Sequence, residues 1–156
     1  MDEQKLSFIK NDLFLLLDNI AETTTASWGK MNAQQMVEHV TGFFMVSTEK
    51  ITFDLVTPEE HLPKFKEFLL SDKQFRENTK APLTVIGEEA LPLRNKTYAE
   101  AVSKLHEAVD HFEAYFKNAP DKKTLHPVFG MLNFDEWVLP HYKHVTHHLR
   151  QFGIAC

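Results

Sequence analysis

The sequence contains a single cysteine, Cys156, so the chain cannot form an internal disulfide framework and we expect a reducing compartment. It also lacks an apolar run of about 18 residues, which argues against a transmembrane helix. The first residues, MDEQK, are charged and lead directly into an amphipathic stretch, so we expect no signal peptide. These absences predict a cytoplasmic protein with no membrane partner.

An excess of positive charge is missing as well. Seventeen Lys and Arg residues stand against 22 Asp and Glu, and the resulting net charge of −5 argues against binding to nucleic acid. Several catalytic motifs are also absent: Glu-x-x-His, G-x-S-x-G, the Walker loop and G-x-G-x-x-G. His106-Glu107 and His111 come close to the zincin helix, but a spacing of five residues turns the second imidazole about 140° away.

Apolar residues, in contrast, are plentiful. With 43% hydrophobic residues in 156, the chain is long enough for one core, and we expect a single domain over residues 1–156. Helical spacing of apolar residues predicts a first core helix over residues 3–20 and a second from about Ala33. A third is predicted over 97–117 and a fourth from about 133 to 152. Three capping boxes support the later starts: Asn32 with Gln35, Thr97 with Glu100, and Asn133 with Glu136.

The remaining segments have weaker patterns. Alternation over 51–56 and the residues 83–86 suggest two short strands, and a peripheral helix is predicted from Pro58 to about Leu70. We expect residues 71–96 to lie over one end of the fold, 118–133 to be loop, and Pro140 to kink the last helix. Together these elements predict an all-α four-helix bundle with a long crossover of about fifty residues between the second and third core helices.

Histidine is concentrated near the end of the chain. Four of the nine histidines fall within eight residues, at positions 141, 144, 147 and 148. On a helix His144 and His148 lie one turn apart, a spacing that lets two imidazoles bind one metal ion. His39 lies on the apolar stripe of the second helix, where a lone histidine is usually a packed core residue. A core-facing histidine and a pair from another helix could nevertheless converge as three ligands, and we predict His39, His144 and His148 as a metal site.

The neighbours of this triad leave alternatives open. His141 could line the mouth of the site, replace His144 as a ligand, or pack in the core. His147 is expected beside the ligands or facing solvent, and Gln151 either orients a ligand or is structural. Gln35, one turn before His39, is placed to accept the second N–H of that ring. Solvated surface positions are expected for four other histidines: His61, His106, His111 and His126. For His126 a functional role is the alternative, because it lies in the loop that enters the last helix.

Three segments, WGKMNAQQMVEHV, FRENTKAP and HPVFGMLNFDEWVLPHYKHVTHHLRQFG, resemble the DinB-like superfamily of metal-dependent bundle proteins, in one of its bacterial branches. The specific part is a histidine on the second helix joined to H-x-x-x-H-x-x-Q on the fourth, which maps to His39, His144, His148 and Gln151. The resemblance implies an up-down-down-up bundle, zinc or nickel on the three histidines, and in many members a homodimer. It also implies a low-molecular-weight thiol as a cofactor, for which Arg76, Arg94 and Arg150 are candidate binding residues. Pro140 departs from the family pattern and leaves the residues at the mouth of the site open.

Three functions follow for testing. The first is a metal-dependent transferase or hydrolase that acts on a small molecule, with metal-activated water or thiol as the reactive group. The second is a bundle that binds a metal or ligand without turnover, since Glu38, the acidic neighbour of His39, is turned about 100° away and no general base is evident. The third is a dimeric structural protein whose histidines form an unmetallated polar network.

Overall fold

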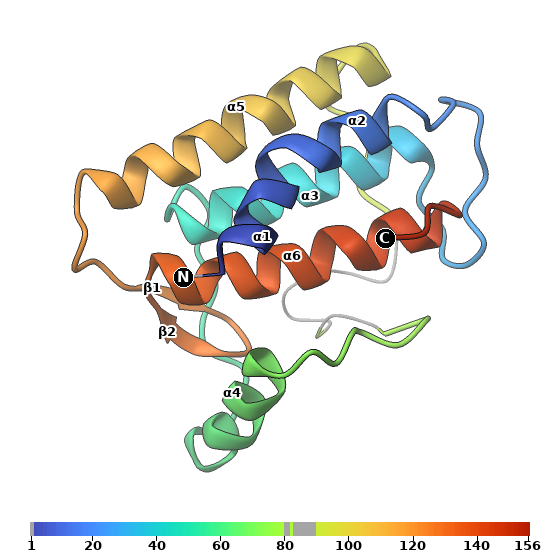
Figure 1. Ribbon diagram of the computed structural model, residues 1–156. Helices are drawn as coiled ribbons and strands as arrows, with labels where there is room; N and C mark the ends of the chain where they lie inside the picture. Colours follow the sequence, from blue (N-terminus) through green and yellow to red (C-terminus); the bar gives the residue numbers. More distant parts are fainter. Residues whose placement is uncertain (1, 80–81, 83–89) are drawn as a thin grey trace.

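The computed structural model describes residues 2–79, 82 and 90–156, so the strand predicted at 83–86 lies outside the described residues. The described chain is mostly helical, with one small two-stranded sheet (Figure 1). Within these ranges, no helix has both the length and the apolar character needed to cross a bilayer.

The predicted first helix is divided by a wider turn. It consists of α1 (Glu3–Ser7), a π-helical turn (Phe8–Asp12) and α2 (Leu13–Leu17), so the regular helix ends three residues earlier than residue 20. Asp2 caps its start, because its carboxylate accepts the backbone N–H of Lys5 at 3.1 Å. The apolar spacing still holds through the wider turn, and Ile9, the one buried residue of that turn, packs into the core.

The three longer helices begin where their caps predict. Helix α3 (Ala33–Ser47) and helix α6 (Phe134–Gln151) each start with a complete capping box. Helix α5 (Tyr98–Lys117) has only half of one: Thr97 accepts the N–H of Glu100, but the Glu100 carboxylate accepts the N–H of Lys96 instead of Thr97. These local hydrogen bonds fix the residues at which the helices start.

Pro140 does not interrupt the last helix. Helix α6 runs from Phe134 to Gln151 as one helix with Pro140 buried inside it, so the proline does not end the helix. A proline removes one backbone donor and leaves one carbonyl without its partner. The hydrogen bonds of the remaining turns are enough to carry the helix through to the histidines.

Two segments differ from the sequence prediction. Residues 118–133, predicted as loop, contain an antiparallel hairpin of β1 (Thr124–His126) and β2 (Gly130–Leu132). Residues 51–56, predicted as a strand, are irregular, because their backbone gains only isolated bonds such as Val56 N–H to Pro127 O (2.8 Å). Strand formation depends on a partner edge, and the sequence pattern of one segment does not reveal whether it has one.

The predicted peripheral helix is present in shortened form. A 3₁₀ turn (Glu59–His61) leads into α4 (Leu62–Leu70), which packs on α6 and buries Leu69 completely. An ion pair between Lys66 and Glu136 ties α4 to the first turn of α6. The described parts of 71–96 lie along α3 and α6, where they hydrogen bond to Gln34 and Lys143 among others.

The core lies between the N-terminal helical segment, α3, α5 and α6. Helix α3 contacts α5 and α6, and the N-terminal segment contacts the same two helices (Figure 1). The largest completely buried side chains come from all four segments: Trp137, Phe44, Phe112, Phe116, Ile9, Leu13, Leu17, Met36, Leu105 and Leu149 among them. This packing sets α3 against α6, the two helices that carry the predicted ligands.

Candidate metal centre

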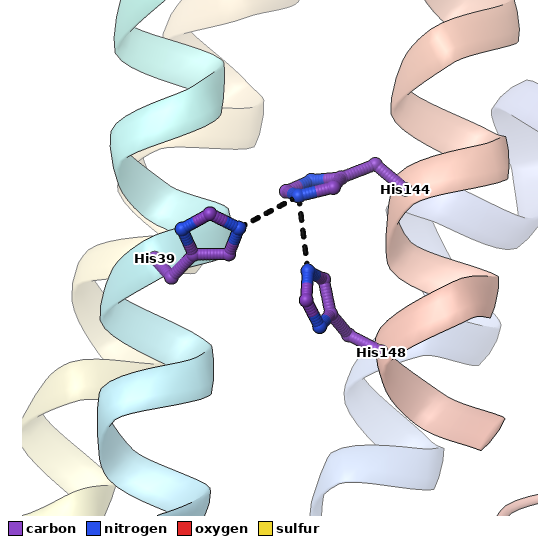
Figure 2. A group of neighbouring side chains, drawn as sticks. All are labelled: His39, His144 and His148. Carbon is purple, nitrogen blue, oxygen red and sulfur yellow. Dashed lines mark hydrogen bonds between the residues drawn. The ribbon is translucent and has the colours of Figure 1, made fainter. Parts of the chain in front are cut away.

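The three predicted ligands meet between α3 and α6. Figure 2 shows His39 of α3 and the pair His144 and His148 of α6 pointing toward one another. The Nε2 atom of His144 lies 2.9 Å from Nε2 of His39 and 3.1 Å from Nε2 of His148. One nitrogen from each of the three rings lies within 4.8 Å of the other two. The convergence predicted from the sequence is therefore present, while the ligand role of the rings remains a prediction.

The tautomer of His148 follows from its neighbour Gln151. The amide nitrogen of Gln151 donates to the carbonyl oxygen of Trp28 (2.7 Å), so the amide oxygen faces His148 Nδ1 (2.8 Å). An amide oxygen can only accept, so Nδ1 carries the hydrogen of the neutral ring. The Nε2 atom of His148 therefore presents a lone pair to the centre of the triad.

Three neutral imidazoles cannot satisfy both short contacts. A neutral ring nitrogen has either one hydrogen or one lone pair, and His144 Nε2 has two nitrogen neighbours. Whichever it has, it cannot make a full hydrogen bond to His39 and to His148 at once. An unsatisfied buried polar group costs about 1–3 kcal/mol, and a cation shared by the three rings would remove that cost.

A proton is a poor candidate for that cation at neutral pH. Burial lowers the pKa of His39 to about 4, with smaller contributions from His147 and the Arg94 guanidinium. Burial likewise holds the pKa of His144 and of His148 well below 6.5, and the neighbouring histidines lower both further. All three rings are therefore neutral at pH 7, the state in which imidazole binds a metal.

The geometry fits a small divalent cation. Tetrahedral zinc with bonds of about 2.0–2.1 Å places its nitrogen ligands roughly 3.3 Å apart, within a few tenths of an ångström of the two short contacts. The third pair, His39 and His148, lies within 4.8 Å, so these two rings would move closer together around such an ion. A tetrahedral ion with three protein ligands has one position left for a small molecule. The ring of Phe43 lies 4.5 Å from that of His144 and covers it with apolar surface. The buried Nδ1 of His144 has no hydrogen-bond partner in the described ranges, so packing orients this ring.

The two neighbouring histidines of α6 are buried without joining the triad. His141 is completely buried, stacks on Phe44 with centroids 3.8 Å apart, and places Nε2 3.0 Å from Ser47 Oγ. It therefore packs in the core and does not replace His144. His147 is only 6% exposed and contacts the rings of Trp28, Phe75 and His148, so the solvent-facing alternative is wrong.

The roles predicted for Gln35 and Gln151 have different outcomes. The Gln35 side chain accepts from Asn32 N (3.0 Å) and donates to Leu91 O (2.9 Å), so the bond predicted to His39 is not formed. The Gln35 amide instead hydrogen bonds to the N-cap of α3 and to the 90–96 segment. Gln151 binds His148 directly, which is the orienting role that the sequence left open.

Glu38 is a buried carboxylate with a structural task. It accepts hydrogen bonds from Gln34 and from the backbone N–H groups of Arg94 and Asn95. Burial raises its pKa, but these hydrogen bonds outweigh burial and leave the pKa lowered. These contacts were not predicted, although an acidic residue within a buried helical stretch indicates that a partner must exist. Because the carboxylate is occupied, it is not free to act as a base.

The three candidate arginines differ in their contacts and exposure. Arg150 donates to two carbonyl oxygens, those of Thr146 and Phe75, and Arg76 is exposed. Arg94 lies beside α3, where its Nη2 donates to Glu38 O (2.7 Å) and sits 3.9 Å from the position of a Cβ on Gly42. Its positive charge contributes to the lowered pKa of His39. Of the three, Arg94 is the one whose charge reaches a histidine of the triad.

His126 is not a surface residue, contrary to expectation. It is 5% exposed, and its Nδ1 accepts the N–H groups of Val128 (2.9 Å) and Phe129 (3.2 Å) in the hairpin turn. Burial lowers its pKa to about 3. The other three predicted surface histidines are partly or fully exposed: His61, His106 and His111.

A hollow of about 660 Å³ lies away from the triad, between residues 56–58, α4 and the hairpin. Its walls are mainly apolar, with Val56, Phe65 and Val128 among them. Size alone would favour it as a ligand site. We take the triad as the candidate site because three ligand atoms converge there and no comparable group of His, Cys, Asp or Glu occurs elsewhere in the described chain.

Comparison with known proteins gives one match. A family model described as a protein of unknown function (DUF1569) matches residues 4–154, a range that includes His39, His144 and His148. Neither a search of curated proteins nor a search of solved structures found a match. Because the family model covers nearly the whole sequence, this chain belongs to the DUF1569 family of proteins of unknown function.

Proposed function

We propose that this protein is a metal-dependent enzyme of the DinB-like superfamily that acts on a small molecule, with zinc or nickel held by His39, His144 and His148. The observation that carries the proposal is the contact of three Nε2 atoms that neutral rings cannot satisfy. Bound there, such an ion lowers the pKa of a water or thiol ligand, the chemistry that hydrolysis and thiol transfer share.

The superfamily assignment has support from the packing. The N-terminal segment and α3 each contact both α5 and α6, as the four members of a helical bundle would. Residues 48–97 join α3 to α5, which is long enough for the crossover of an up-down-down-up order. A four-helix bundle of that order is therefore part of the proposal.

Thiol transfer is the reaction that the surroundings of the triad favour. Glu38, the acidic neighbour of His39, is fully engaged by the 94–95 backbone and is not free to take a proton. A thiol, with a pKa of about 8.5, loses its proton far more readily than water at about 15.7 and needs less help from a protein base. Hydrolysis depends more strongly on a protein base to deprotonate water, and the described residues beside His39 do not provide one.

The test begins with elemental analysis of untagged protein purified without chelator, and continues after reconstitution with zinc or nickel. We expect one equivalent of metal. The loaded protein is then assayed with small thiols and electrophiles, and separately with esters, beside a chelator-treated control. Loss of thiol that requires metal supports the proposal. Failure to take up metal would overturn it, whereas metal without any turnover would favour the non-catalytic binding bundle.

Arg94 supplies a prediction about the substrate. Gly42 follows His39 by three residues, within about 60° around α3, so the Arg94 guanidinium lies on the flank of the triad. Arg94→Ala should weaken binding of a carboxylate-bearing thiol, such as 3-mercaptopropionate, by about tenfold, the size of one partly exposed charged hydrogen bond. Binding is measured by calorimetry on metal-loaded protein.

Two controls accompany this variant. Metal content should be unchanged, and affinity for the uncharged 2-mercaptoethanol should stay within about twofold. Arg94→Lys keeps the charge and should lose less than the alanine variant. Equal losses for the charged and the uncharged thiol would show that Arg94 acts only by tying residues 94–95 to α3.

A further inference from the structure

The segment Ser27–Gly29, between α2 and α3, holds the last residue of α6 at three points. The N–H of Ser27 donates to the backbone oxygen of Gln151 (2.8 Å), and the carbonyl oxygen of Trp28 accepts from the Gln151 amide nitrogen (2.7 Å). The third point is steric: a Cβ on Gly29 would lie 2.5 Å from that same amide nitrogen. We call Ser27–Gly29 the clamp.

The clamp determines which end of the Gln151 amide faces His148. The Trp28 carbonyl accepts hydrogen bonds and cannot donate, so it selects the amide nitrogen and turns the amide oxygen toward His148 Nδ1. A rotated amide would set two oxygens against each other and present a donor to the ring. With Gln151 only 4% exposed, water is poorly placed to rescue that arrangement.

Gly29 keeps the space that this arrangement needs. Its φ of +82° is a conformation that side chains rarely adopt, and any Cβ there would displace the amide of Gln151. The indole of Trp28 also packs edge-on against His147, with ring centroids 5.8 Å apart, which holds the clamp against α6. The clamp backbone and the missing Cβ of Gly29 thus act on the same buried glutamine, while the Trp28 side chain packs on His147.

We propose that the clamp is a positioning element for the metal site, which acts through Gln151 to keep the lone pair of His148 directed at the triad. The inference rests on the proposed metal function, because it concerns the affinity of that site. It predicts that residues more than a hundred positions from His148 in the sequence control metal binding without touching the metal. Groups that orient metal-bound histidines typically contribute 10–100-fold in affinity.

The chain offers a matched control for Gly29. Gly153 has nearly the same backbone conformation, φ +81°, but a Cβ there would meet no atom within 4 Å. Gly29→Ala should weaken zinc affinity by about 10–100-fold in competition with a chromophoric chelator, whereas Gly153→Ala should change it by less than about threefold. The absorption bands of the cobalt-substituted protein should shift in the first variant and not in the second.

A double-mutant cycle separates positioning from general strain. In a Gln151→Ala background the steric target is gone, so Gly29→Ala should cause little further loss of zinc affinity. Equal effects of the two glycine variants, or losses that add in the double variant, would overturn the inference. Wild-type protein that binds no metal would instead overturn the proposed function, so the two failures are distinguishable.

A measurement on the wild-type protein tests the inference even if the variants do not fold. Coupling between two sites is reciprocal, so zinc should strengthen the clamp as the clamp strengthens zinc binding. Hydrogen exchange at the Ser27 amide should slow on zinc loading by a larger factor than at the Lys122 amide, which bonds to Ala119 O elsewhere in the fold. The same factor at both amides would contradict the inference.

Discussion

Replacing His144 with alanine is expected to abolish stoichiometric binding of zinc and nickel. The Nε2 atom of His144 is the one that contacts both partners, at 2.9 Å to His39 and 3.1 Å to His148. Its removal leaves two imidazoles from different helices, and we expect affinity to fall by more than about 100-fold, beyond the loss typical of an orienting residue. Metal content is measured by elemental analysis of wild type and variant purified in parallel.

A second readout is thermal unfolding. Zinc binding to the folded state should raise the melting temperature of the wild type in proportion to affinity and free metal concentration, and leave His144→Ala unchanged. His106→Ala is the control, because His106 is exposed on α5, where its ring contacts Asp110 and Phe14. One equivalent of metal retained by His144→Ala would show that the site has been assigned to the wrong residues.

Acid is expected to destabilise the metal-free protein well above the range in which carboxylates titrate. Burial lowers the pKa of His126 to about 3 and holds that of His141 well below 6.5. In the unfolded chain these rings take up protons near 6.5, so between about pH 6.5 and 3 the unfolded state binds more protons. The free energy of unfolding is therefore at its full value above pH 6.5 and falls as the pH decreases.

The magnitude can be worked out for His126. Each pH unit well below the unfolded pKa costs about 1.4 kcal/mol for one ring that stays neutral in the fold, so the loss between pH 6.5 and 4.5 is roughly 2 kcal/mol. Urea unfolding of chelator-treated protein at several pH values measures this slope. His126→Asn retains an acceptor for the N–H groups of Val128 and Phe129, and should reduce the slope by about one proton.

The corresponding control is His106→Asn, the same replacement at an exposed position. The comparison is between slopes, so a general loss of stability in His126→Asn does not affect it. An identical slope in His126→Asn and wild type would mean that His126 takes up its proton in the folded state as readily as in the unfolded one.

Features that depend on residues three or four positions apart could be predicted from the sequence alone. The capping boxes at Asn32 and Asn133 place the starts of α3 and α6, because each is a pair of hydrogen bonds within one turn. The spacing of His144 and His148 places both rings on one face of α6 for the same reason. These signals are complete within a short window of sequence.

Which distant groups meet depends on the packing of the whole chain. It set His39 against His144 and packed His141 on Phe44, drew Gln35 to Leu91, and buried His126 in a hairpin that the sequence pattern did not reveal. It also brought Trp28 and Gly29 to Gln151 across the fold. Such contacts depend on how whole helices and loops pack, and a residue's periodicity along its own helix carries no information about the partner on the next.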